Sequence, residues 1–207
     1  MNIFILSPAN CAGVRGRRLI EGRDTSLLAE RLRAVGMPLG DVFSSLSGLY
    51  FRGKLTYARR FANPPDPTCP IVARGVLVIT PSAGLSSADS PVTLGALEAF
   101  ARVDVAADNE TYRRPLVASA RAVAEHIGSE CGVVLLGSIA TPKYVDVLHE
   151  VFGRQLKFPS DFVGRGDMSR GGLLLRRAAS GRELVYVPVE GAVRHGTRPP
   201  RLQPPRT

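Results

Sequence analysis

Three short runs of consecutive apolar residues divide the chain, and each has the pattern of a strand that is covered on both faces. The runs are residues 2–6, 75–79 and 132–136. A buried strand shows a continuous apolar run, whereas a strand with one solvent-exposed face alternates apolar and polar residues. The three runs therefore predict a parallel sheet that lies between layers of helices.

Amphipathic segments between these runs predict helices. Thr25 is a candidate N-cap, Gly128 is a candidate glycine after a helix end, and Thr141 with Pro142 forms an N-cap and first-turn pair. The predicted order of strands and helices indicates an α/β fold, a single domain whose small, mostly parallel central sheet is flanked by helices. The predicted helices span residues 25–35, 39–46, 54–62, 92–102, 113–127 and 142–152.

The C-terminal part has a weaker pattern. Residues 171–176 and 182–187 flank Ala179-Ser180-Gly181, and this arrangement predicts a C-terminal hairpin. A helix that begins near Met168 is the competing interpretation. Residues 191–207 contain four arginines, four prolines and no acid. We therefore expect residues 1–190 to form the domain and residues 191–207 to form a flexible basic tail.

The charge of the chain favours an anionic partner. The chain has 27 basic and 18 acidic residues, a net charge of +9, and all its basic residues except Lys54, Lys143 and Lys157 are arginines. A guanidinium fork matches phosphate geometry better than an ammonium does, so a polyanion or a phosphorylated molecule is the expected partner. The codon usage of a high-GC genome is the alternative explanation for the arginine content.

Other classes of protein are disfavoured by what the sequence lacks. No apolar run approaches the roughly 20 residues that a bilayer span needs. The N-terminus has no signal-peptide pattern, and the three cysteines match neither a disulfide framework nor paired zinc spacing, so we expect a cytoplasmic protein without a bound metal. No Walker A or dinucleotide-binding motif is present, and no cofactor is expected.

Hydroxyl-rich, neutral segments follow all three predicted strands, at residues 7–10, 80–84 and 137–141. The carboxyl ends of parallel strands share one edge of a sheet, where ligands bind. The last segment also leads into a predicted helix, whose N-terminal amides attract phosphate. Ser7, Ser138 and Thr141 are therefore candidate ligand-binding residues, although serine, threonine and glycine are also ordinary loop residues.

Residues 46–61 resemble a helix–hairpin–helix DNA-binding element, with glycines bounding a short predicted hairpin between two helices. In such an element, hairpin amides contact a DNA phosphate and neighbouring cations add charge. Those cations are Arg52, Lys54, Arg59 and Arg60. The alternative is a pair of helices whose apolar residues face the core while the charged residues face solvent.

A glycine-rich segment at residues 162–172 carries two arginines, Arg165 and Arg170, that are five positions apart. They are able to converge on one anion, with Asp167 orienting either of them. A structural ion pair between Asp167 and one of these arginines is the alternative. His126, His149 and His195 are isolated, and no nucleophile elbow or zinc-binding helix motif is present.

Four short segments, taken together and in order, form a recognisable set: Ile5-Leu6-Ser7-Pro8-Ala9, Leu46-Ser47-Gly48-Leu49-Tyr50, Ala140-Thr141-Pro142-Lys143-Tyr144 and Arg165-Gly166-Asp167-Met168-Ser169-Arg170. They occur in the same order as the motifs of the YaaA peroxide-stress family, whose patterns are ISPAK, LSGLYG, NLAS-x-x-Y and RG-x-MSR. The chain resembles this family over residues 3–190. The resemblance implies a DNA-binding protein that limits peroxide- and iron-driven DNA damage, with an α/β core and a helix–hairpin–helix element.

The chain also departs from the family's motifs. Asn10 stands in place of the lysine of ISPAK, Cys11 in place of the next threonine, and Ser138 in place of the asparagine of NLAS. Residues 51–60 lack the family's continuation and look more like a related group of small bacterial domains that have been suspected of acting on bases or nucleotides. A diverged branch with its own substrate is therefore a second expectation.

Two functional hypotheses follow. The first is a cytoplasmic DNA-binding protein of oxidative or DNA-damage stress, whose phosphate contacts come from Ser7, Arg52, Lys54, Arg59, Arg60, Thr141, Lys143, Tyr144, Arg165, Ser169 and Arg170. The second is an enzyme that acts on a nucleobase or nucleotide, such as an N-glycosidase, with Asp167, Ser138 and Asn10 as catalytic candidates.

The enzyme hypothesis requires a pocket with polar groups for the base edge and an aromatic ring, Tyr50 or Tyr57, on which the base stacks. A protein-interaction module that acts through its Pro/Arg tail is a third possibility. The expected pocket residues are Ser7, Asn10, Ser82, Ser138, Tyr144, Asp167 and Arg170.

Overall fold

The computed structural model describes residues 1–197, 199 and 200 of the chain. In this part, one mixed sheet has the strand order β4-β3-β1-β6-β7-β8. The neighbours β3, β1, β6 and β7 are parallel, and the two edge strands are antiparallel to theirs. The strand bounds are β1 (Asn2–Leu6), β3 (Val76–Thr80), β4 (Gly84–Ser87), β6 (Gly132–Leu136), β7 (Leu156–Pro159) and β8 (Tyr186–Pro188).

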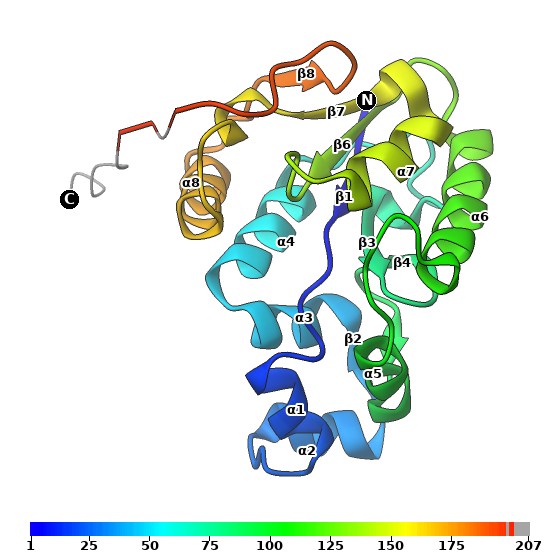
Figure 1. Cartoon of the computed structure of the whole chain (residues 1–207), viewed down its shortest axis with the longest axis vertical. Helices are drawn as coiled ribbons and strands as arrows, with labels where there is room; N and C mark the ends of the chain where they lie inside the picture. The colour runs from blue at the N-terminus through cyan, green and yellow to red at the C-terminus, as the bar shows by residue number, and fades with distance from the viewer. Residues whose placement is uncertain (198, 201–207) are drawn as a thin grey trace.

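Helices cover both faces of this sheet, which confirms the predicted α/β class. Helices α4 (Leu49–Phe61) and α8 (Asp167–Ser180) lie on one side, and α6 (Glu110–Ile127) and α7 (Pro142–Phe152) lie on the other (Figure 1). The three predicted strands β1, β3 and β6 are the buried centre of the sheet; β1 loses contact with solvent from Ile3 to Leu6. The continuous apolar runs correctly indicated strands covered on both faces.

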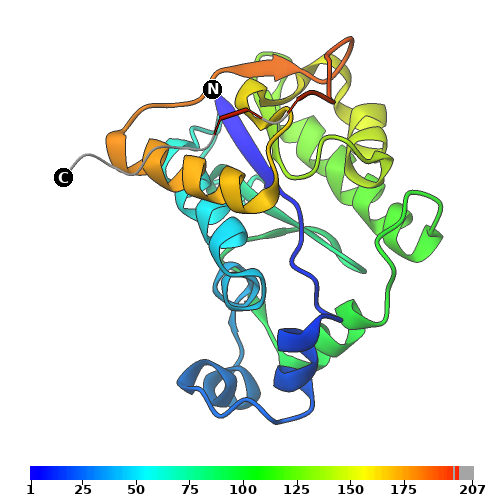
Figure 2. The same cartoon turned by 60° about the vertical axis from the view of Figure 1, so that its left-hand side comes forward.

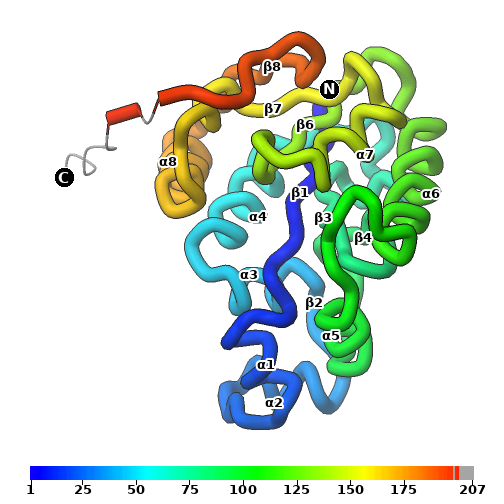
Figure 3. Tube along the Cα trace, viewed as in Figure 1, coloured from blue at the N-terminus to red at the C-terminus, as the bar shows by residue number. Residues whose placement is uncertain are grey.

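A smaller group of elements lies beyond the carboxyl end of β1. It contains α1 (Val14–Ile20), α2 (Leu27–Ala34), α3 (Leu39–Ser47), α5 (Leu94–Ala101) and the short ribbon of β2 (Met37–Pro38) with β5 (Pro91–Val92). The chain leaving β1 passes α3 before it enters α1 (Figure 3). Three short 3₁₀ turns complete the described elements, at Ala73–Gly75, Gly153–Gln155 and Ser160–Phe162.

The helix starts follow from capping residues. Ser26, rather than the predicted Thr25, caps α2, because its side chain accepts a hydrogen bond from the Ala29 amide. Asn109 caps α6 in the same way and moves its start three residues before the predicted one. Thr141 and Pro142 begin α7 as predicted, although the Thr141 side chain makes no capping hydrogen bond.

The predicted helix–hairpin–helix element is wrong. Only Gly48, at φ +64°, separates α3 from α4, and the residues expected to form the hairpin lie inside α4. Gly53 was interpreted as a turn residue, but it is the point where α8 crosses α4 (Figure 2). A Cβ atom at Gly53 would lie 2.7 Å from the carbonyl oxygen of Gly171, so glycine is required there for close packing.

The predicted C-terminal hairpin is also wrong, and the competing helix near Met168 is confirmed. Residues 171–176 belong to α8. Gly171 packs closely against α4, because a Cβ atom on Gly171 would lie only 2.9 Å from the Leu49 carbonyl oxygen. The second predicted strand of the hairpin is partly correct: β8 pairs with β7 instead of with residues 171–176. Because Gly53 and Gly171 lack side chains, α8 is able to pack directly against the backbone of α4.

The described start of the predicted tail lies against the domain. Arg194 is 3.9 Å from the Asp146 carboxylate, and the Thr197 carbonyl lies 2.1 Å from where a Cβ atom on Gly164 would be. Residues 198 and 201–207 of the predicted tail lie outside the described residues. In the described part, no helix combines the length and the apolar character that a membrane span requires.

Candidate functional site

The candidate site lies at the carboxyl ends of β1 and β6. From β1 the chain continues to β3 on one side and later returns to β6 on the other side, so the strand order reverses at β1. Ligands of open α/β sheets bind in the crevice at such a switch point. The Ser7 amide donates to the Leu136 carbonyl at 3.1 Å, and the Ser7 side chain lies against Gly137. The exits of the two strands are therefore in direct contact, as predicted.

Lys54 extends from α4 into this contact instead of into solvent. The residue is 1% exposed, and its Nζ atom donates to the Ser7 carbonyl at 2.6 Å and to Ser7 Oγ at 2.8 Å. The same atom lies 4.7 Å from the ring centres of Tyr50 and Phe51. Burial lowers the pKa of Lys54 to about 7, because a charged amine loses hydration there. Lys54 is thus enclosed, and the prediction that it contacts a DNA backbone requires a solvent-facing position that it does not have.

Tyr50, one turn before Lys54, contributes a polar atom to the same place. Its side chain is buried, and Tyr50 Oη has no hydrogen-bond partner of good geometry among the described residues. The charges of Arg170 and Asp167 on α8 both act on this hydroxyl: Arg170 lowers its pKa and Asp167 raises it. Burial raises the pKa of Tyr50, so the hydroxyl keeps its proton at neutral pH.

Arg170 connects α8 to the exit of β6. Its guanidinium donates to the Phe162 carbonyl at 2.9 and 3.3 Å and to the Gly137 carbonyl at 3.4 Å, and it lies over the Phe162 ring. It is also 3.8 Å from the Asp167 carboxylate, which is the structural ion pair considered as the alternative. Arg170 is buried. These hydrogen bonds attach the start of α8 to the exit of β6.

Asp167 is the exposed acid of the group. It occupies the first turn of α8, and its side chain is 68% exposed. Its negative charge raises the pKa of Tyr50 and Tyr144 and opposes the lowering of the pKa of Lys54, so the carboxylate is close enough to interact electrostatically with all three. The structure thus brings Asp167 together with the predicted residues Ser7, Tyr144 and Arg170.

A cavity of about 500 Å³ shares one residue with this group. Tyr144 belongs to both, because it lines the cavity and lies near Asp167. Of the other predicted pocket residues, Asn10 lines it as predicted, and those that do not are Ser7, Ser82, Ser138, Asp167 and Arg170. Lys143, which was predicted as a phosphate contact, and Pro81, the neighbour of Ser82, also line it. Its full lining is Pro8, Ala9, Asn10, Cys11, Ala12, Pro81, Phe100, Ala101, Arg102, Val103, Asp104, Val105, Lys143 and Tyr144.

The start of α7 completes the crevice. Thr141 Oγ1 donates to Ser138 Oγ at 3.5 Å, and no side chain caps the first amides of α7. Ser138 and Thr141 are both partly exposed. An uncapped helix N-terminus favours an anionic group, and here it follows the exit of β6, which contacts Ser7.

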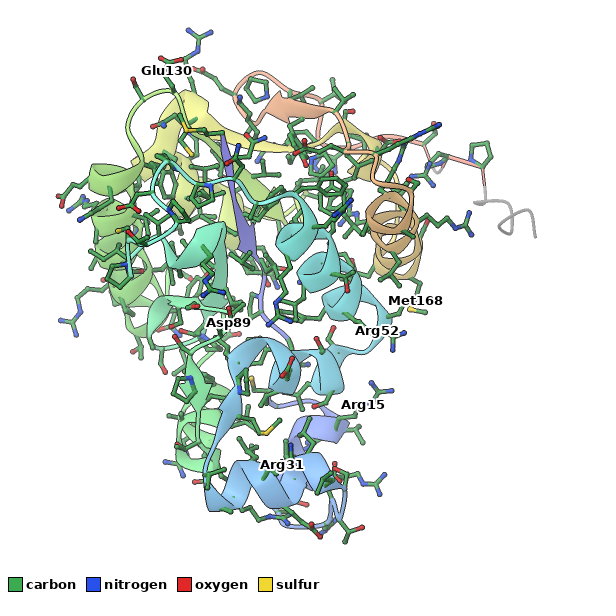
Figure 4. All side chains as sticks on the ribbon, turned by 180° about the vertical axis from the view of Figure 1, so that it is seen from behind. Arg15, Arg31, Arg52, Asp89, Glu130 and Met168 are labelled. Atoms are coloured by element: carbon green, nitrogen blue, oxygen red, sulfur yellow. The ribbon has the colours of Figure 1, made fainter. Side chains whose placement is uncertain are left out.

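The remaining predicted cations do not join this group. Arg59 forms an ion pair with Asp89 at 2.6 Å, and Arg165 donates to the Asp161 carbonyl at 2.9 Å and to Ser169 Oγ at 3.3 Å. Arg52 and Arg60 are exposed on α4. Figure 4 shows Arg52 near Met168 at the start of α8, while Asp89 lies over a different part of the molecule. The predicted contact residues therefore occupy several surfaces.

Tyr57 does not line the crevice either. It is fully buried, its Oη atom is 2.6 Å from Tyr186 Oη, and it accepts a hydrogen bond from the Leu184 amide at 2.7 Å. Of the two tyrosines considered for base stacking, only Tyr50 therefore lies at the site. Tyr57 instead connects α4 to the segment that leads into β8.

Sequence reasoning missed the buried position of Lys54 and the contribution of Arg102 and Asp104 to the cavity. A sequence pattern does mark Lys54: together with Tyr50, Tyr57 and Ala58 it follows the i, i+4, i+7, i+8 spacing of the apolar face of α4. No comparable pattern marks Arg102 or Asp104, which lie in the segment after α5.

Comparison with protein-family models, with curated proteins and with solved structures finds no match to this chain. Within the described residues, no three histidine, cysteine, aspartate or glutamate side chains gather as metal ligands would. Any functional assignment therefore depends on the geometry of the crevice.

Proposed function

We propose that this protein is an enzyme that acts on a nucleotide or nucleobase and cleaves an N-glycosidic bond in the crevice beside β1 and β6. One observation carries the proposal: the exposed Asp167 carboxylate and the buried Tyr50 hydroxyl, which has Arg170 beside it, lie close enough to interact electrostatically at a switch point of the sheet. The adjoining cavity of about 500 Å³ is within the usual size range of small-molecule sites.

The groups present suit the chemistry of this reaction. When the bond between the sugar and the base nitrogen breaks, its electron pair leaves with the base and positive charge develops on the sugar ring. The Asp167 carboxylate stabilises that charge and accepts a proton from the attacking water, as carboxylates do in glycoside hydrolysis. The Tyr50 hydroxyl, which remains protonated, is a hydrogen-bond donor for the departing base. Lys143 and the start of α7 favour a phosphate group.

A substrate screen tests this proposal. The protein is incubated with nucleosides, nucleoside monophosphates and oligonucleotides that contain modified bases, and free base is measured by chromatography. We expect base release from at least one class. Asp167→Asn should lower the rate about 100-fold or more, because the variant loses the carboxylate charge and the proton acceptor.

The matched control is Asp161→Asn, which neutralises a partly exposed acid six residues earlier. Arg165 donates to the backbone carbonyl of Asp161 and not to its carboxylate, so this variant should keep the wild-type rate. No release of base from any class of substrate, or equal rates for the two variants, would contradict the proposal.

DNA binding is the second candidate function. It is supported by the net charge of +9, by the exposed Arg52 and Arg60 on α4, and by the resemblance to the YaaA peroxide-stress family. The two functions are compatible if the base to be released belongs to a nucleic acid strand. If the protein binds DNA, we expect it to act in the cytoplasm during oxidative or DNA-damage stress.

A further inference from the structure

Lys54 is enclosed on all sides, and both acceptors of its hydrogen bonds belong to one residue, Ser7. Among the described residues, no carboxylate lies within ion-pair distance of its amine. An ammonium group carries three N–H donors, and two of them are used here. A buried amine without an ion pair is costly, so its presence at the end of the central strand points to a role beyond packing.

The charge of Lys54 decides the direction of its hydrogen bond to Ser7 Oγ. A charged amine has no lone pair, so Ser7 Oγ must accept, and the hydroxyl proton of Ser7 remains available for an acceptor in the crevice. An uncharged amine has a lone pair and competes for the hydroxyl proton of Ser7. When it accepts that hydrogen bond, Ser7 has no proton left to donate to a ligand.

Groups from three helices face the amine and its surroundings. Tyr50 on α4 lies beside it, Asp167 and Arg170 approach from α8, and Tyr144 at the start of α7 lies near Asp167. The negative charge of Asp167 favours the charged amine, whereas burial opposes it. With a pKa of about 7, both states of Lys54 are populated at neutral pH, and a bound anion is able to shift the balance.

The place next to Ser7 suits an anion. The uncapped start of α7 follows the adjacent strand exit along the chain, and Tyr50 Oη is a second buried donor, without a hydrogen bond of good geometry in the described part of the chain and with Arg170 as its charged neighbour. These two features are independent of the Lys54–Ser7 contact. Together they offer several hydrogen-bond donors to a phosphate group at the carboxyl ends of β1 and β6.

We propose that Lys54 is a positioning residue that couples its own protonation to phosphate binding: the charged amine keeps the Ser7 hydroxyl available as a donor, and a bound phosphate keeps the amine charged. This inference rests on the proposed function, since it assigns the phosphate of the nucleotide to the Ser7 end of the crevice. Coupling between two binding events is reciprocal. Phosphate binding must therefore raise the pKa of Lys54, and deprotonation of Lys54 must weaken phosphate binding.

The chain offers a direct measurement, because it contains only three lysines, Lys54, Lys143 and Lys157. Lysine labelled with ¹³C at the ε position gives three NMR signals, which the variants Lys143→Arg and Lys157→Arg assign. The pH titration is recorded without ligand, with AMP, and with sulfate, a phosphate analogue whose charge is constant over this pH range. We expect the Lys54 signal to titrate near neutral pH. The pKa of Lys54 obtained from this titration should be higher by about half a pH unit or more when either anion is present.

Binding of the same anions to variants supplies the second readout. For the wild type, the affinity for sulfate should fall about fivefold or more as the pH rises through the titration of Lys54. Ser7→Ala leaves Lys54 in place and should abolish this pH dependence. Lys54→Arg keeps the charge and should bind sulfate with an affinity that no longer changes with pH; amide NMR spectra establish that each variant is folded.

A Lys54 signal that does not move with either anion would overturn the inference, as would an unchanged pH dependence in Ser7→Ala. The base-release assay, carried out at a single pH, tests the proposed function independently of the coupling between Lys54 and phosphate. Base release without the coupling contradicts this inference alone. Coupling without base release from any substrate contradicts the proposed glycosidic chemistry and leaves an anion site at Ser7.

Discussion

Lys54 combines two opposing effects within one residue. Its methylene chain fills the apolar interior beside Tyr50 and Phe51, while its amine loses hydration that two hydrogen bonds to Ser7 only partly replace. The lowered pKa of Lys54 expresses this cost. The stability of the protein must therefore depend on pH through this residue.

The sign of that dependence follows from the direction of the pKa shift. Lys54 has a pKa of about 7 in the folded protein and 10.5 as its ordinary value, so between these values the unfolded chain binds more protons. The free energy of unfolding should therefore rise with pH over this interval, and below it the full cost of the buried charge is present.

Urea denaturation of the variant Lys54→Met tests this dependence. The variant should be more stable than the wild type by about 1 to 3 kcal/mol near pH 6, and it should lack the increase between about pH 7 and pH 9. Lys143→Met, which changes a partly exposed lysine, is the control and should keep the wild-type profile. A wild-type stability that is flat over this range would show that Lys54 is not a buried, titrating amine.

At the scale of elements, the contact between α4 and α8 decides where the site residues lie. Gly53 and Gly171 allow the two helix backbones to touch, and this contact brings Tyr50 and Lys54 next to Asp167 and Arg170. Side chains larger than hydrogen at the contact would separate the helices. The crevice therefore depends on two residues that take no part in its chemistry.

The variant Gly53→Ala measures this dependence. Its Cβ atom would lie 2.7 Å from the Gly171 carbonyl oxygen, so α4 and α8 must separate, and we expect a loss of about 2 to 3 kcal/mol in the free energy of unfolding. Gly95→Ala is the matched control on α5, because no atom lies within 4 Å of its Cβ position. That variant should gain up to about 1 kcal/mol from helix propensity. Equal effects of the two substitutions would contradict the close contact.

The same glycines explain which elements the sequence was able to predict. The three central strands were predictable because continuous apolar runs depend only on burial on both faces. The sequence pattern places Gly53 at the edge of a hairpin and Gly171 at the start of a strand, since a local pattern does not reveal a glycine that admits a neighbouring helix. The helix–hairpin–helix element and the C-terminal hairpin were wrong for this one reason.

The candidate site was predictable to a similar extent. Ser7 and Ser138 were expected together, because the exits of parallel strands meet at one edge of the sheet. Tyr144, Asp167 and Arg170 were expected beside them only as pocket residues of the enzyme hypothesis. The burial of Lys54 was not predicted, since it depends on the face of α4 that α8 and the exit of β1 cover. That information is present only in the tertiary structure.

At the scale of the whole molecule, the positive charge is divided among different surfaces. Arg15 and Arg52 follow one edge (Figure 4), whereas Arg59 is paired with Asp89 elsewhere. Lys54 and Arg170 are buried and contribute no surface charge. If the body of the protein binds DNA, the exposed arginines of α4 must carry part of the phosphate contacts.

The double variant Arg52→Gln with Arg60→Gln tests the second candidate function. Each lost phosphate contact lowers the slope of log affinity against log salt by about 0.9, so the slope for duplex DNA should shrink by about 2. The control removes two arginines that are already ion-paired, Arg59→Gln with Arg113→Gln, and should change the slope less. Equal slopes for the two double variants would assign the DNA contacts to other residues.

The position of bound AMP in a crystal structure of the complex would show whether the carboxyl ends of β1 and β6 form the nucleotide site. We expect the phosphate to lie at Ser7 and the start of α7, and the glycosidic bond to lie between Asp167 and Tyr50. AMP bound elsewhere, for example in the hollow that Arg15, Arg18 and Arg23 line, would contradict this expectation.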